Sequence, residues 1–160
     1  MAHPYSTRET LNTLLGDVLV VKLLDLNKDG NEDAGVYDAV REEADREIDS
    51  CLAKYFAVPF GRASDDTAPD QIKTLSDQVT AGFLLAKRHK SAEEVKFYLD
   101  RANETIKQLI AGTKELLYAD TGETAERTDA DDRPAGFKKA STDPKFGGVD
   151  SAGVQRMSKW

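Results

Sequence analysis

Apolar residues recur at helical spacing through most of the first 118 residues. The clearest pattern spans residues 36–56, where steps of three and four connect Val36, Val40, Ala44, Ile48, Cys51, Leu52, Tyr55 and Phe56. The opposite side of this segment is charged, which is typical of a helix face in water. Because the residue before a proline is pushed out of the α region, we expect this long helix to end at Val58, before Pro59.

Two shorter helices are predicted ahead of the long one. The run Ser6-Thr7-Arg8-Glu9 matches a capping box, in which Ser6 accepts from the Glu9 amide and Glu9 reaches back to the Ser6 amide. An apolar stripe then continues to Leu15. The segment 18–24 is apolar without a period of two, so we expect a second short helix there, with a short buried strand as the alternative.

Two further helices are predicted after the long one. Pro69 suits the first turn of a helix, and apolar residues continue from there at helical spacing to Ala86. A second capping box, Ser91-Ala92-Glu93-Glu94, opens the next helix, which we expect to stop at Gly112. The apolar residues 116–118 are suited to dock back onto the bundle.

The sequence therefore predicts an all-α fold. We expect a small bundle of four to five helices around one long central helix over residues 1–118, followed by an extended C-terminal arm over residues 119–160. In the arm, Gly and Pro alternate with Asp, Thr, Ser and Lys, and no apolar stripe appears. Such a segment cannot build a core of its own.

The arm carries a few large apolar side chains that we interpret as anchors for a protein partner or a neighbouring subunit. They are Phe137, Phe146, Met157 and Trp160. Sparse large apolar groups dominate contacts of this kind, and segments without a core often fold on binding. The alternative is that they are unordered linker residues or crystal contacts.

Composition excludes several classes of protein. The 160 residues include 22 basic and 29 acidic side chains, a net charge of −7, which argues against an electrostatic grip on nucleic acid. The longest apolar runs fall far short of the ~20 residues that a bilayer requires. The only cysteine, Cys51, cannot form an internal disulfide, and the N-terminus lacks the basic start and apolar run of a signal peptide. We therefore expect assembly in the cytoplasm.

One loop resembles the opening of a calcium-binding loop. The run from Asp25 to Asp33 has oxygen donors at positions 1, 3, 5 and 9 and glycine at position 6. Position 12, however, is Val36 instead of a bidentate carboxylate, and no second loop is present to pair with it. We favour a turn in which Asp33 caps the next helix, and we keep a calcium-binding regulatory module as an alternative function.

No constellation of residues predicts catalysis or a cofactor. Cys51 lies on the apolar stripe of the long helix, which favours a small buried hydrophobe over a nucleophile. His3 and His89 have no companion at metal-ligand spacing. The chain also lacks a Gly-rich phosphate loop, a Gly-x-Ser-x-Gly motif and paired Cys-x-x-Cys motifs. We expect neither an enzyme, nor a cofactor, nor a metal site.

Several motifs together resemble the head-tail connector (adaptor) family of Mu-like tailed phages and prophages. They are, in order, the short capped helix, Gly16-Asp17, the aspartate-rich turn, Ile48-Asp49-Ser50-Cys51-Leu52, the exit Tyr55 to Phe60, and Ile110 to Leu116. The resemblance covers about residues 5–118. The sequence departs from the family in a longer acidic insertion between Tyr118 and Arg133.

The resemblance implies a structural role without turnover. Members form a ring below the portal, here expected to be a dodecamer that matches it, and the ring extends the DNA channel and docks the tail-completion (stopper) protein. An acidic lumen would let DNA slide past without specific binding. The resemblance places the protein in the neck of the virion and gives Phe137 to Trp160 the role of the family's arm. A stopper or tail-terminator subunit is the alternative within structural proteins, although these are usually rich in β-structure.

Overall fold

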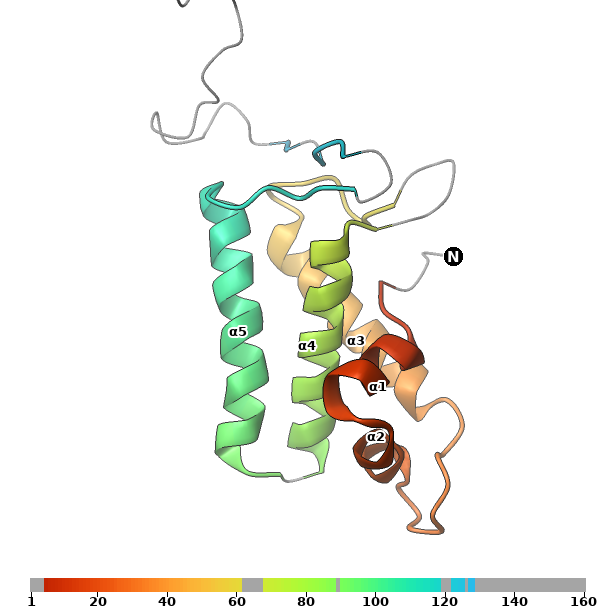
Figure 1. The fold of residues 1–160 in the computed structure, drawn as a ribbon. Coiled ribbons are helices and arrows are strands. Elements are labelled where there is room, and N and C mark those ends of the chain that lie inside the picture. Colours follow the sequence, from red (N-terminus) through yellow and green to blue (C-terminus); the bar gives the residue numbers. More distant parts are fainter. Residues whose placement is uncertain (1–4, 62–67, 89, 119–121, 126, 129–160) are drawn as a thin grey trace, which may run out of the picture. The chain divides into compact units, whose positions relative to one another are not determined.

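The described part of the chain folds into five α-helices (Figure 1). The computed structural model describes residues 5–61, 68–88, 90–118, 122–125, 127 and 128, which belong to one compact unit that ends at Ala130. The helices are α1 (Arg8–Leu15), α2 (Asp17–Leu24), α3 (Val36–Leu52), α4 (Asp70–Lys87) and α5 (Ala92–Ala111). These residues contain no strand, so the predicted all-α class is confirmed. The boundary expected between residues 118 and 119 stays a prediction.

The short helices α1 and α2 meet at Gly16, whose φ of 85° is a conformation that favours glycine. The capping box of α1 uses Thr7 and Thr10, so the predicted pair of Ser6 and Glu9 was wrong. Ser6 is buried, and its hydroxyl lies 3.1 Å from Ser76 Oγ of α4. Ser6 therefore makes a hydrogen bond inside the protein and does not cap α1. Residues 17–24 are helical, which settles the choice between helix and strand.

Helix α3 buries the predicted stripe but differs from the prediction at both ends. Its N-cap is Gly35 in the left-handed region, and Asp33 turns back to the preceding loop instead of capping the helix. The helix ends at Leu52, six residues before the predicted end at Val58. Tyr55 and Phe56 still pack on the core, and Phe56 forms an isolated antiparallel bridge with Arg127. The residues that follow α3 thus pair with a segment far along the chain.

Helix α4 lies at the centre and packs against all four other helices. Pro69 is its N-cap, and the side chains from Leu75 to Leu85 are buried with the exception of Phe83, which is half-buried. Helix α5 begins at the predicted capping box of Ser91 and Glu94 and stops at Gly112 with a left-handed φ of 73°. These two helices form the most extensive contact in the body, side by side in Figure 1.

The chain after α5 continues to pack on the body. Leu116 is buried, Tyr118 is half-buried and Leu117 is exposed, so the expected docking of residues 116–118 is confirmed in part. Ala125 N donates to Leu116 O at 2.8 Å. The Arg127 guanidinium donates to the carbonyl oxygens of Leu109 at 2.6 Å and of Ile110 at 3.1 Å, and so satisfies orphan acceptors at the end of α5.

Two apolar clusters make the core. One joins the C-terminal half of α3 to α4, α5 and the segments around Phe56, Phe60 and Leu116. The other joins α1 and α2 to the C-terminal half of α4 and to Val40 of α3. None of the helices in the described residues is long and apolar enough to cross a membrane.

Candidate interaction surfaces

Tyr5 ties the N-terminal segment to α3. Its Oη donates to Asp49 Oδ1 at 2.5 Å and accepts from Phe60 N at 2.8 Å, while Tyr5 N donates to Asp45 Oδ2 at 3.3 Å. Burial, and then the hydrogen bond to Asp49, raise the pKa of the Tyr5 hydroxyl far above its ordinary value. The hydroxyl therefore stays protonated, and this contact holds the fold instead of supplying an acid or a base.

Three buried or half-buried carboxylates share this region between α1, α3 and α4. Asp45 accepts from Ser76 Oγ at 2.6 Å, and Asp77 accepts from Thr10 Oγ1 at 2.8 Å. Burial raises the pKa of Asp77 to about 6 and also raises the pKa values of Asp45 and Asp49. None of the three lines either of the two pockets described below, so their perturbed titration reflects the packing of α3 and α4.

The aspartate-rich loop satisfies its own oxygens. Asp25 Oδ2 accepts from Gly30 N at 2.9 Å, and Asp33 Oδ2 accepts from Leu26 N at 2.5 Å. Asn27 Oδ1 accepts from the backbone two residues on, which is an Asx-turn. Within the residues that the structure describes, no group of three or more His, Cys, Asp or Glu side chains is arranged to hold a metal ion. The loop is thus a turn, as expected, but Asp33 bonds to Leu26 and Asn27 and does not cap α3.

Cys51 packs against the core but is only half-buried, so the prediction of a buried hydrophobe is confirmed in part. Its Sγ lies 3.9 Å from Glu47 Oε1. Burial, and then the charge of Glu47, raise the pKa of the thiol. The thiol is therefore protonated at neutral pH, which disfavours a nucleophile.

An apolar groove opens between the short helices and α5. Its volume is about 320 Å³, and it is lined by the apolar or aromatic side chains of Leu15, Leu19, Leu85, Phe97 and Tyr98 and by Glu93 and Glu94. Phe97 is 59% exposed although it stands edge-on to Tyr98, with ring centroids 5.1 Å apart. A large exposed aromatic beside a groove is a common mark of a protein contact.

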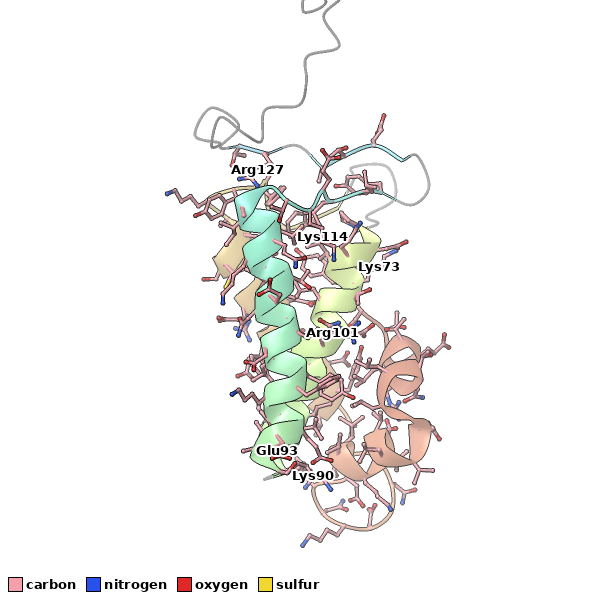
Figure 2. All side chains as sticks on the ribbon, turned by 60° about the vertical axis from the view of Figure 1, so that its left-hand side comes forward. Lys73, Lys90, Glu93, Arg101, Lys114 and Arg127 are labelled. Carbon is pink, nitrogen blue, oxygen red and sulfur yellow. The ribbon has the colours of Figure 1, made fainter. Side chains whose placement is uncertain are left out.

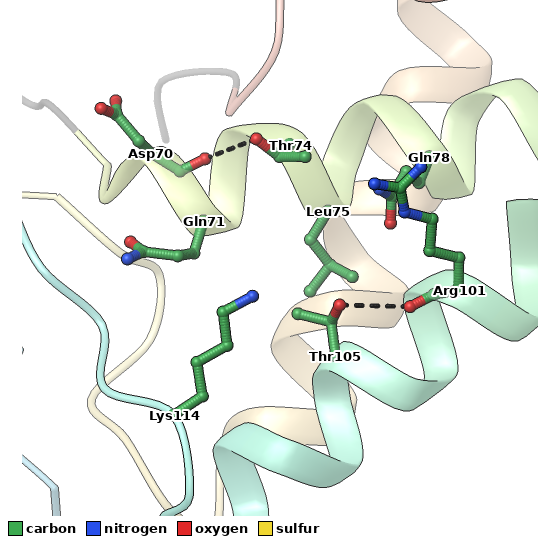
Figure 3. A pocket seen from close by; sticks show the side chains of 8 residues that line it. All are labelled: Asp70, Gln71, Thr74, Leu75, Gln78, Arg101, Thr105 and Lys114. Atoms are coloured by element: carbon green, nitrogen blue, oxygen red, sulfur yellow. Dashed lines mark hydrogen bonds between the residues drawn. The ribbon is translucent and has the colours of Figure 1, made fainter.

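A second hollow lies between α4 and α5, and we call it the cationic cleft (Figure 3). Its volume is about 270 Å³. It is lined by Asp70, Gln71, Thr74, Leu75 and Gln78 of α4, by Arg101 and Thr105 of α5, and by Lys114. Figure 2 shows Lys73, Arg101 and Lys114 along the same side of these two helices.

The lining of the cationic cleft offers more hydrogen-bond donors than it uses. Thr74 Oγ1 donates to Asp70 O at 2.9 Å, and Thr105 Oγ1 donates to Arg101 O at 3.1 Å (Figure 3). Each hydroxyl therefore already donates its proton to a backbone carbonyl of its own helix. Among the described residues, the side chains of Arg101 and Lys114 make no ion pair or hydrogen bond. Two unpaired cations therefore face a cleft in an otherwise acidic protein.

The predicted anchors of the arm, Phe137, Phe146, Met157 and Trp160, lie outside the described residues. Sequence reasoning missed both hollows. The sequence does indicate the exposure of Phe97, because this large apolar residue falls outside the buried stripe of α5. No such indication exists for the cationic cleft, because its cations come from segments that only the fold brings together.

Comparison with known proteins gives one family. The family described as Bacteriophage Mu, Gp36 matches residues 5–133, which include all five helices and most of the chain. Comparison with curated proteins gives no match. A match of this extent agrees with the resemblance to Mu-like phage proteins and with a structural or morphogenetic role in a phage. The chain therefore belongs to the family of the bacteriophage Mu protein Gp36.

Proposed function

We propose that this protein is a head-tail connector subunit. It forms a ring below the portal in the neck of the virion, extends the DNA channel, docks the tail-completion (stopper) protein and catalyses no reaction. The observation that carries the proposal is the family match over residues 5–133. The all-α body fits a connector better than a stopper or tail-terminator subunit, which would be rich in β-structure.

The surfaces of the body support a protein that acts through contact. The apolar groove leaves Phe97 largely in water, and the cationic cleft leaves Arg101 and Lys114 without partners among the described residues. Both features cost stability in an isolated subunit and become favourable when another protein covers them. A ring subunit, which meets a neighbour on each side, has a use for such surfaces.

Net charge supports conduction of DNA instead of binding. Residues 1–130 contain 16 basic and 25 acidic side chains, a net charge of −9. A lumen with this negative net charge repels phosphate, so DNA would pass through it without binding.

Co-purification with the portal protein of the same phage tests the proposal. We expect the full chain to bind the portal and to form rings that are visible by electron microscopy. A chain that neither binds the portal nor forms a ring at saturating portal concentration would contradict the proposal. The matched control is Leu26→Ser, which changes an exposed apolar residue outside both hollows and should not affect binding.

A truncated chain tests the arm separately. Residues 122–125, 127 and 128 contact the body, so the truncation begins after Ala130. We expect circular dichroism to show the helices intact and the pull-down to show that portal binding is lost. Portal binding at full strength by the truncated chain would refute the role of the arm.

A further inference from the structure

We propose that the cationic cleft is a docking site for a carboxylate side chain that α3 of a second copy of this chain presents. This inference rests on the proposed ring and specifies which surfaces of neighbouring subunits meet in it.

The charge of the cleft favours an anion. Asp70 is the only carboxylate among the described residues of the lining, and its Oδ1 is paired with Lys73 Nζ at 3.0 Å. Arg101 is exposed and Lys114 is half-buried, and neither has an acidic partner among the described residues. A carboxylate of 4–5 heavy atoms fits easily in about 270 Å³, and Arg binds carboxylates in a bidentate geometry that Lys cannot match.

A buried polar atom in the cleft also lacks a partner. Gln78 is 5% exposed, and its Oε1 makes no hydrogen bond with any residue that the structure describes. Such an atom costs free energy until a donor reaches it. Arg101 and Gln78 both line the cleft (Figure 3). Because a guanidinium has five N–H donors, a carboxylate that draws Arg101 inward brings a donor to Gln78 as well.

The charge of the whole body favours a single carboxylate over a polyanion. With a net charge of −9 on residues 1–130, a run of nucleic-acid phosphates would be repelled beyond the cleft, whereas one carboxylate that enters it meets a lining that contains Arg101 and Lys114. Two copies of this body also repel each other unless a positive patch of one faces a negative patch of the other. The cleft supplies the positive patch.

The outward face of α3 supplies the negative patch. Its inner stripe is buried, and its exposed carboxylates are Asp38, Glu42, Glu43 and Glu47. Glu43 pairs with Lys87 Nζ at 2.6 Å. Among the described residues, Glu42 lies 3.9 Å from the Arg41 guanidinium, and Glu47 is approached only by the Cys51 thiol. Glu42 and Glu47 are therefore the carboxylates most available to a neighbour.

The two patches lie on different sides of the body, as a repeating contact requires. Ser76 of α4 contacts Asp45 of α3, and it lies about 200° around the helix from Thr74, which lines the cleft. The α3 side and the cleft side of α4 are thus nearly opposite. A contact between two different faces repeats from copy to copy and gives a ring when the rotation closes.

Charge reversal on each side tests the inference in the full chain. The cleft variant is Arg101→Glu/Lys114→Glu, and the α3 variant is Glu42→Lys/Glu47→Lys. The wild type should self-associate in sedimentation equilibrium at concentrations up to millimolar, and each variant alone should associate at least about tenfold more weakly. An equimolar mixture of the two variants should recover association, because in an alternating arrangement the reversed charges meet at every second contact and the wild-type charges meet at the contacts between them.

The control is Lys96→Glu/Lys107→Glu, which reverses the same number of charges on the side of α5 away from the cleft and should associate like the wild type. Circular dichroism confirms that each variant is folded. The inference is overturned if the wild type does not self-associate, if the cleft variant associates like the wild type, if the control is weakened as much, or if the mixture does not recover.

Portal binding by the same proteins separates this inference from the proposed function. If the wild type binds the portal but the charge reversals do not change self-association, the docking of α3 in the cleft is wrong and the connector role stands. If the wild type does not bind the portal, the connector role fails, and the recovery of association in the mixture still decides whether the cleft receives α3.

Discussion

Replacing Asp77 with asparagine should stabilise the protein near neutral pH and make its stability less dependent on pH. Asp77 is 8% exposed, and burial raises its pKa from 3.8 to about 6. The folded protein therefore binds this proton more tightly than the unfolded chain does. The resulting stabilisation is fully present below about pH 4 and is lost as the pH rises through about 6.

The size of the effect follows from the two pKa values. A rise from 3.8 to about 6 corresponds to about 3 kcal/mol between the protonated and ionised limits. Between about pH 5 and about pH 7.5, roughly half of this change remains, about 1.4 kcal/mol. The asparagine amide keeps the shape of the carboxyl group, and its oxygen can still accept from Thr10 Oγ1. The free energy of unfolding of Asp77→Asn relative to the wild type should rise by this amount over the interval.

Urea denaturation followed by far-UV circular dichroism measures this difference at a series of pH values. The matched control is Asp100→Asn, an exposed position on α5, which should keep the pH dependence of the wild type. If the free energies of Asp77→Asn and the wild type differ by a constant amount across the interval, Asp77 does not hold its proton more tightly in the folded state, and the reasoning is refuted.

Three other substitutions test the packing by the same measurement. Gly82→Ala should destabilise the protein by about 1–3 kcal/mol, because its Cβ would lie 2.5 Å from Leu99 Cδ2. In a Leu99→Ala background the same change should instead stabilise by about 0.5–1 kcal/mol, and a cost that persists there would contradict the contact. Thr80→Val should stabilise by about 1 kcal/mol, because the buried Thr80 Oγ1 has no hydrogen-bond partner in the described structure, and a loss of stability would show that it has one. Ile48→Asp buries an unpaired charge in the core and should abolish the cooperative unfolding transition, so a variant with a normal transition would contradict the burial of Ile48.

Local signals in the sequence were enough for most of the helical fold. The stripe through Val40, Ala44 and Ile48 predicted the buried face of α3, and the capping box at Ser91 and the stop at Gly112 predicted both ends of α5. These signals work because their partners lie within one or two helical turns, where the backbone itself fixes the spacing.

The tertiary structure decided what depends on distant residues. Phe56, which follows the end of α3 at Leu52, pairs with Arg127, and Ser6 leaves its predicted cap and is buried against Ser76. No local pattern contains either partner. The apolar groove and the cationic cleft also depend on residues that are distant in the sequence.

The sequence by itself determined the all-α class, the order of the helices and the resemblance to Mu-like phage proteins. Only the fold brought Arg101, Lys114 and the buried Gln78 to one cleft and left Phe97 largely exposed beside the groove. The physical reason is that a periodic pattern specifies which side of a helix is buried but not which other helix covers it. The cleft and the groove exist only where two such helices meet.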